Sequence, residues 1–263
     1  MLKAFFCGLR LIKIIGIIGI ISLSLLLTFS DATEKEKAAP SLRTFDEDVA
    51  RSRRKMRTYC AINQELITAK ASDQTKQAEA VKFLKEAQEL WSAVRQRYQD
   101  NPPIEYSRDT KFKARLAEIS EVMDEMFAHL EAGRIKRSFQ TCGFACGLFV
   151  NMHEENGLIY GLDQLFHLRK LIKTTETLNK NAGLDAVKKI IPALLQKRNE
   201  VFMTPCPWPD DVKKCQEYTT ALKILSSELD NLTLAVNKGE DNEVSKILSD
   251  LPNLCNTAYT LSL

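Results

Sequence analysis

Three cysteines are the residues of this sequence best suited to chemistry. Cys142 and Cys146 are four residues apart, so on a helix they lie one turn apart on the same face. Two thiolates in that arrangement suit a soft metal ion such as Cu(I) or Zn(II), and Cys60 would supply a third ligand. The alternative is a disulfide from Cys60 to Cys142 or Cys146, which joins two helices. The sequence favours the disulfide, because the chain has the marks of an exported protein.

The N-terminal residues are the reason for expecting export. Lys3, Arg10 and Lys13 precede an uncharged run of 16 residues, 14–29, and Ser30-Asp31-Ala32 follows it. This order predicts a signal peptide over residues 1–32, and hence a periplasmic protein. The alternative is an uncleaved anchor in the inner membrane, although the run is shorter than the roughly 20 residues of a spanning helix. Residues 33–44 are polar, and we expect them to form a flexible leader.

The remaining cysteines also suggest disulfides, because an even number of them is left once Cys7 is removed with the signal peptide. Cys206 and Cys215 flank a proline-rich loop and predict a local disulfide. Trp208 in this loop either contacts a partner or folds back over the end of a helical bundle. Cys255 either pairs with whichever of Cys142 and Cys146 is free or stays a buried thiol.

The charge of the chain argues against nucleic acid as a partner. The formal net charge is +3, and residues 33–263 carry 34 basic and 33 acidic residues. One local exception is the basic run formed by Arg51, Arg53, Arg54, Lys55 and Arg57. It would suit an anionic membrane surface, although a solvated helix face is the interpretation that we prefer. A protein partner is expected, and its identity is not predicted.

Apolar residues recur at intervals of three and four along the chain, which is the pattern of buried helix faces. Eight such helices are separated by breaks, which include Ser72-Asp73, Asn101-Pro102-Pro103, Gly133, Asn156-Gly157, Gly183 and Lys238-Gly239. Ser72-Asp73 also predicts the N-cap of the second helix. No strand pattern occurs. Each half shows the same order of helices, which predicts an internal duplication. The predicted fold is all-α, with two tandem antiparallel four-helix bundles over residues 45–157 and 158–263.

The end of each half resembles the end of a cytochrome c-prime domain, which is a four-helix bundle with covalent haem. In the second half the resemblance rests on residues 234–241 and 254–259 (LAVNKGED and LCNTAY). In the first half it rests on residues 129–133 (HLEAG) with Cys142, Cys146 and Phe149. The family needs Cys-x-x-Cys-His. Here Cys142 and Cys146 are spaced by four and followed by Gly147, and Ala258 and Tyr259 follow Cys255. No haem ligand is therefore carried over from the family.

Two glycines and one histidine, Gly143, Gly147 and His153, lie near these cysteines in the sequence. Gly143 and Gly147 are unfavourable inside a helix, so we expect close approach of another helix or of a flat ligand such as non-covalent haem. His153 is too far from Cys146 to share one ion, since seven helical residues rise about 10 Å. We interpret it as an exposed histidine near the C-terminus of a helix.

The sequence contains no catalytic motif, so we do not predict an enzyme. The predicted function is that of a non-catalytic binding protein without a cofactor. The alternative is a periplasmic redox protein, or a carrier of haem, copper or zinc, that uses Cys142 and Cys146, with Gly143 and Gly147 beside the cofactor.

Overall fold

The computed structural model of the chain describes residues 39–69 and 73–263. The predicted signal peptide, 1–32, and most of the predicted leader lie outside the described residues. The first helix begins at Leu42. This start falls within the last three residues of the predicted leader, 33–44. Among the described residues, no helix is long and apolar enough to cross a membrane.

The described residues are all-α, as the apolar periodicity predicted. One short 3-10 helix, η1, follows Pro102-Pro103 and was not predicted. In chain order the helices are α2 (Leu42–Ala69), α3 (Gln74–Tyr98), η1 (Ile104–Tyr106), α4 (Phe112–Glu131), α5 (Ile135–Glu154), α6 (Gly161–Ala182), α7 (Leu184–Met203), α8 (Val212–Lys238) and α9 (Asp241–Leu261).

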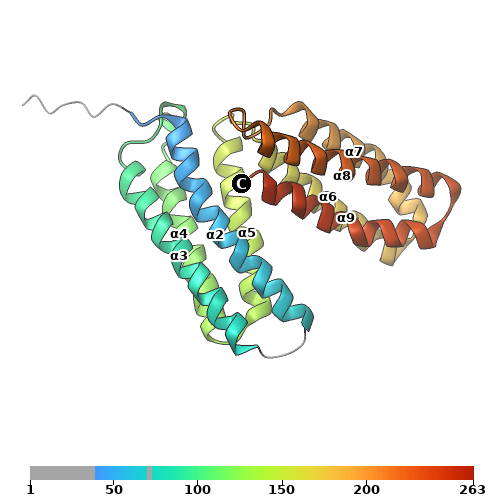
Figure 1. Cartoon of the computed structure of the whole chain (residues 1–263), viewed down its shortest axis with the longest axis horizontal. Coiled ribbons are helices and arrows are strands. Elements are labelled where there is room, and N and C mark those ends of the chain that lie inside the picture. The colour runs from blue at the N-terminus through green and yellow to red at the C-terminus, as the bar shows by residue number, and fades with distance from the viewer. Residues whose placement is uncertain (1–38, 70–72) are drawn as a thin grey trace, which may run out of the picture. The chain divides into compact units, whose positions relative to one another are not determined.

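The helices pack in two sets, which are consistent with two helical bundles (Figure 1). In the first set α2 packs on α3, α3 on α4 and α4 on α5, and α5 returns to α2. In the second set α6, α7, α8 and α9 follow the same order, and α9 returns to α6. The predicted boundary after Gly157 falls between α5 and α6. Each set has its own apolar core, so each half of the sequence buries its own helix faces.

Large aromatic side chains fill the core of the first bundle. Trp91 on α3 packs edge-on against Phe149 on α5, with ring centroids 5.3 Å apart. Its indole nitrogen donates a hydrogen bond of 3.0 Å to the carbonyl oxygen of Leu116 on α4. Phe45 packs on Tyr98 and on Tyr106 from η1, at 5.0 and 5.3 Å. These contacts fix the positions of α2 and α5, which carry the cysteines.

The core of the second bundle is mostly aliphatic. The fully buried residues come from one stripe on each helix, and they include Leu165, Leu168 and Ile172 on α6, Leu194 on α7, Leu229 and Leu232 on α8, and Leu248 and Leu251 on α9. The stripes repeat at three and four residues, because that spacing keeps one face of a helix toward the core.

Several helix ends form where the sequence predicted them. The side chain of Asp73 accepts a hydrogen bond of 3.0 Å from the backbone nitrogen of Lys76, which caps α3. Gly239 ends α8 in the left-handed conformation, with φ of 75°. Pro192 lies inside α7, and the helix continues through it.

Candidate functional site

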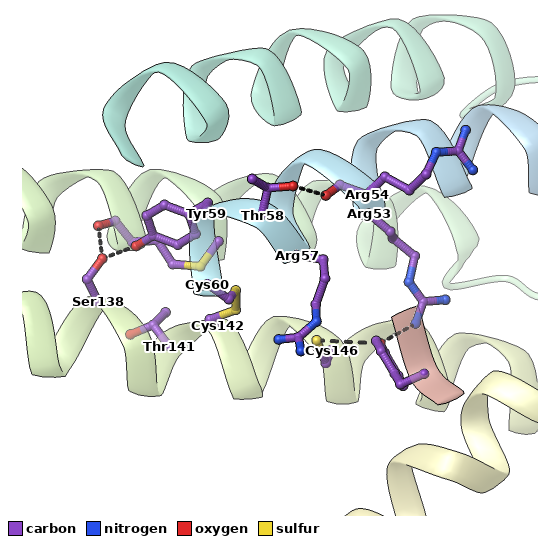
Figure 2. The surroundings of a disulfide bond; sticks show 12 residues. Arg53, Arg54, Arg57, Thr58, Tyr59, Cys60, Ser138, Thr141, Cys142 and Cys146 are labelled. Carbon is purple, nitrogen blue, oxygen red and sulfur yellow. Dashed lines mark hydrogen bonds between the residues drawn. A yellow bond between two sulfur atoms is a disulfide. The ribbon is translucent and has the colours of Figure 1, made fainter. Parts of the chain in front are cut away.

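The predicted disulfide between the first and last helices of the first bundle is present. It joins Cys60 on α2 to Cys142 on α5, with a Cα–Cα distance of 6.4 Å (Figure 2). Both side chains are buried. Sulfur atoms joined to each other are not thiolate ligands, so two of the three sulfurs predicted for a metal site are already bonded. This pairing disfavours the metal site built on Cys60, Cys142 and Cys146.

The third sulfur, that of Cys146, is a free and partly exposed thiol. The hydroxyl of Tyr259 on α9 lies 3.8 Å from it and is placed to donate a hydrogen bond. The guanidinium of Arg57 on α2 points toward Cys146 in Figure 2. Burial lowers the pKa of Arg57, and nearby Arg169 lowers it further, whereas Tyr259 and Cys146 raise it. Cys146 therefore lies beside a guanidinium group and a hydroxyl placed to donate to its sulfur.

Next to this thiol lies Arg53, an arginine that is only 3% exposed. One of its terminal nitrogens donates a hydrogen bond of 3.0 Å to the hydroxyl of Tyr259. Its guanidinium lies over the ring of Phe149, 4.7 Å from the centroid. Its Nε has no hydrogen-bond partner among the described residues. Burial acts to lower the pKa of Arg53, but Tyr259, Asp163 and Cys146 raise it, and the net shift is upward.

The basic run is therefore not the solvated helix face that the sequence suggested. Arg53 is buried, Arg54 donates to the carbonyl oxygen of Leu263, and Arg57 donates to the hydroxyl of Thr260 at 3.4 Å. These three arginines lie on α2, and their partners lie at the end of the second bundle. Of the other two cations in the run, Arg51 pairs with Asp48, and Lys55 pairs with Glu86 at 2.6 Å. The run is mostly used in contacts within the chain.

The interpretation of His153 as an exposed histidine was wrong. Its side chain is 4% exposed, and its Nδ1 lies 2.7 Å from a carboxylate oxygen of Asp163 on α6. Its ring packs against that of Tyr160, with centroids 4.4 Å apart. The predicted position of His153 near the C-terminus of a helix is confirmed, since α5 ends at Glu154. The burial was missed because it comes from α6, whose position against α5 is a tertiary feature.

A second carboxyl group extends this polar cluster onto α2. The hydroxyl of Tyr160 donates a hydrogen bond of 2.8 Å to Asp46. Burial raises the pKa of Asp46 to about 6, even though Tyr160 and His153 act in the opposite direction. The cluster therefore contains a carboxyl that changes charge near neutral pH.

The expected close approach at Gly143 and Gly147 is not found. A Cβ built at Gly143 would meet no atom of the described residues within 4 Å. At Gly147 the nearest atom is a ring carbon of Phe166, at an ordinary contact distance of 3.8 Å. Packing of a neighbouring helix therefore does not explain Gly143.

The cysteines of the second bundle form one predicted disulfide and one predicted buried thiol. Cys206 and Cys215 form the local disulfide, with a Cα–Cα distance of 5.9 Å. Cys255 stays a buried thiol beside the carbonyl oxygen of Leu165, and burial raises its pKa to about 12. Trp208 folds back onto the end of α9, since its indole nitrogen donates a hydrogen bond of 2.8 Å to the carbonyl oxygen of Leu261.

Sequence reasoning missed Arg53, Asp163 and Asp46 as parts of the site. One signal was present for Arg53, which follows Val49 by four residues and precedes Met56 by three, so it lies on the buried stripe of α2. A cation at such a position predicts a buried partner. No comparable pattern marks the two aspartates.

The chain matches no known protein family, no curated protein and no solved structure. The resemblance to cytochrome c-prime stays a prediction from the quoted residues.

Proposed function

We propose that this chain is an exported, non-catalytic protein that binds a partner protein. Its fold would be two tandem antiparallel four-helix bundles, related by duplication and similar to cytochrome c-prime without haem. The two disulfides support export, because such bonds persist in oxidising compartments such as the periplasm. Export to the periplasm also follows from the predicted signal peptide.

The observation that carries the binding role is a groove between α8 and α9. It has a volume of about 480 Å³. Its lining residues come from one face of each helix and are Lys213, Gln216, Glu217, Thr220, Ala221, Ile224, Leu254, Thr257 and Leu261. Ile224 is 52% exposed, and Val212, in the turn of α8 that precedes the groove, is 70% exposed. We infer that the exposed apolar side chains of this groove, beside polar ones, serve as an interaction surface.

The shape and chemistry of this groove suit an amphipathic helix of the partner. Such a helix places its apolar stripe between two parallel or antiparallel helices and leaves its charges at the rim. Lys213 and Glu217 line the groove, are exposed and would pair with charges of either sign. Because these pairs stay exposed, most of the affinity would come from burying Ile224 and its apolar neighbours.

Site-specific crosslinking in the native host tests this role. A photoreactive amino acid at position 224 should give one discrete adduct, whose mass identifies the partner. The matched control is position 223, which is exposed on the same helix but does not line the groove. Substitution of Ile224 by Asp should abolish capture through a reactive group at position 220. Equal adducts from 223 and 224, or none from 224, would count against a partner in this groove.

The intact mass of the mature protein, purified without reductant, tests the remaining parts of the proposal. We expect the mass of the chain from Thr33 less the hydrogens of two disulfides. A mass increased by a haem group would contradict a cofactor-free binding protein.

A further inference from the structure

Three sulfurs lie on the side of α5 that faces α2. Cys142 is bonded to Cys60, and Cys146 follows one helical turn later. The two helices run in opposite directions along this contact, because Arg53, seven residues before Cys60, lies over Phe149, seven residues after Cys142. Figure 2 shows the disulfide and the free sulfur of Cys146 in one row along α5, with Arg57 beside Cys146. The free thiol of Cys146 therefore lies on the same helix as Cys142, one of the two cysteines of the disulfide.

The free thiol differs from the disulfide in its access to solvent. Cys60 and Cys142 are 4% and 5% exposed, whereas Cys146 is partly exposed. Thiol–disulfide exchange needs direct attack of a thiolate on a sulfur atom, so a reagent in solution is kept from the buried pair. Among these three sulfurs, Cys146 is the one that a thiol in solution can reach.

The turn of α5 that carries Cys142 and Cys146 is weakened by Gly143. Glycine has a poor helix propensity because its backbone is more free in the unfolded state. At Gly143 no atom of the described residues would obstruct a Cβ, and its φ is not positive. The glycine is therefore required by neither packing nor backbone conformation. The glycine instead allows this turn of the helix to distort. A disulfide bond between residues 142 and 146 needs such a distortion.

The surroundings of Cys146 resemble those of reactive cysteines in their geometry. Arg57 places a positive charge beside the sulfur, and the Tyr259 hydroxyl is placed to donate to it. Reactive cysteines are typically found in such electropositive and partly exposed surroundings. Cys255 offers the contrast, since it is buried beside a carbonyl oxygen.

From these observations we propose that Cys60, Cys142 and Cys146 form a thiol–disulfide exchange site, in which Cys146 opens the buried disulfide to thiols in solution. The Cys146 thiolate attacks the sulfur of Cys142. A bond between Cys142 and Cys146 forms as the bond between Cys142 and Cys60 breaks. Cys60 leaves as a thiolate and takes up the proton that Cys146 gave up. No electrons are gained or lost in this step.

The second step uses an external dithiol as the substrate. Four residues of helix separate Cα atoms by about 6 Å, which lies within the usual range for a disulfide. A thiolate of the dithiol attacks Cys146, which forms a mixed disulfide and releases Cys142 as a thiolate. The second thiol of the reagent then displaces Cys146. The reagent leaves as a disulfide, and Cys60 and Cys142 are both reduced.

The exchange also changes the contact with α9. The hydrogen bond that Tyr259 is placed to donate to Cys146 is lost when this sulfur turns toward Cys142. The same hydroxyl accepts a hydrogen bond from Arg53. The exchanged form, in which Cys142 is joined to Cys146, would therefore have a looser contact between the first bundle and the second. This consequence holds whichever partner occupies the groove between α8 and α9.

The rate of reduction under native conditions tests the proposal. The folded chain is treated with dithiothreitol, quenched with N-ethylmaleimide and digested, and alkylation of Cys60 and Cys142 is followed by mass spectrometry. Cys146→Ser should slow reduction of this disulfide by at least about tenfold, because the direct route to the buried sulfurs is closed. Cys255→Ser should leave the rate unchanged. The disulfide between Cys206 and Cys215 serves as the internal control in each sample. An unchanged rate in Cys146→Ser would overturn the proposal.

A second variant keeps all the cysteines and so covers the case in which Cys146→Ser fails to fold. Gly143→Ala should slow the exchange about fivefold, which corresponds to the propensity difference of about 1 kcal/mol. A peptide with Cys142 joined to Cys146 and an alkylated Cys60 should also be found in the unmodified protein without dithiothreitol. Absence of that peptide, together with an unchanged rate in Gly143→Ala, would equally overturn the proposal.

Discussion

The two bundles bury different kinds of side chain. The buried polar residues of the first bundle are Asp48, Ser52, Arg53, Asn63, Ser138 and His153. Those of the second bundle are Asp163, Thr175 and Ser262. The first bundle also buries most of the large aromatic residues, whereas the second buries mainly leucine and isoleucine. The groups able to do chemistry are thus concentrated on α2 and α5.

The cysteines show the same difference. In the first bundle a disulfide joins the first helix to the last, and a partly exposed thiol lies one turn away. In the second bundle the disulfide closes a short loop, and the free thiol is buried. A comparable four-helix framework therefore holds a partly exposed thiol beside a disulfide in one half, and a buried thiol far from the disulfide loop's cysteines in sequence in the other.

The largest expected effect is the loss of the disulfide of the first bundle. Cys60→Ala with Cys142→Ala should lower the free energy of unfolding by about 4 kcal/mol, because the bond closes a long loop in the unfolded chain. Its cysteines are 82 residues apart, and those of the second bundle are 9 apart. Cys206→Ala with Cys215→Ala should cost about 2.5 kcal/mol. Urea denaturation measures both, and a reversed order of the two losses would contradict this difference.

A smaller loss should follow removal of the buried arginine. Arg53→Ala should lower the free energy of unfolding by about 3 kcal/mol, because it removes packing against Phe149 and a charged hydrogen bond to Tyr259. Gln64→Ala is the control on the same helix, and its exposed side chain should matter by less than about 0.5 kcal/mol. If the two variants unfold at the same urea concentration, Arg53 does not stabilise the contact between the bundles.

The pH dependence of stability should reveal the polar cluster between α2 and α6. The raised pKa of Asp46, about 6, means that the folded chain holds a proton that the unfolded chain has lost. The contribution of this proton to the free energy of unfolding is complete below about pH 4 and is lost as the pH rises through 6. Its size is about 2 kcal/mol after allowance for partial exposure. The charged or titratable groups that act on Asp46 are Tyr160, His153, Glu105 and Arg53.

The test is the difference in free energy of unfolding between the unmodified chain and Asp46→Asn from pH 4 to pH 7. The unmodified chain should lose stability relative to the variant as the pH rises. Asp48→Asn should behave in the opposite way, and its effect should change with pH below about pH 4. Burial raises the pKa of Asp48, but hydrogen bonds from Tyr98 and Arg51 outweigh it, so its stabilisation is lost at low pH. A difference that does not change with pH would remove Asp46 from the cluster.

The smallest expected effect separates two glycines, one in each bundle. Gly143→Ala should stabilise the chain by about 1 kcal/mol, because the site is open and its φ is not positive. Gly239→Ala should destabilise it by about 1 kcal/mol, because φ is 75° there. Thermal unfolding measures both variants. A loss of stability in Gly143→Ala would show that packing, rather than freedom of the turn, accounts for that glycine.

Much of the fold could be predicted from local sequence. Spacing of three and four marked each helix, and residues such as Asp73, Gly133 and Gly239 marked the ends. The pairing of Cys206 with Cys215 followed from a short loop that brings its own ends together. The choice between Cys142 and Cys146 as partner of Cys60 could not be predicted, because both lie on the same face of α5.

The sequence by itself determined which faces of the helices are buried, because burial along a helix follows the local period of apolar residues. The tertiary structure alone decided the surroundings of Arg53, His153 and Cys146. Arg53 is buried by Tyr259, which is 206 residues away in the chain, and His153 is buried by α6. The physical reason is that the charge and burial of a polar group depend on every helix packed against it, and periodicity describes only its own.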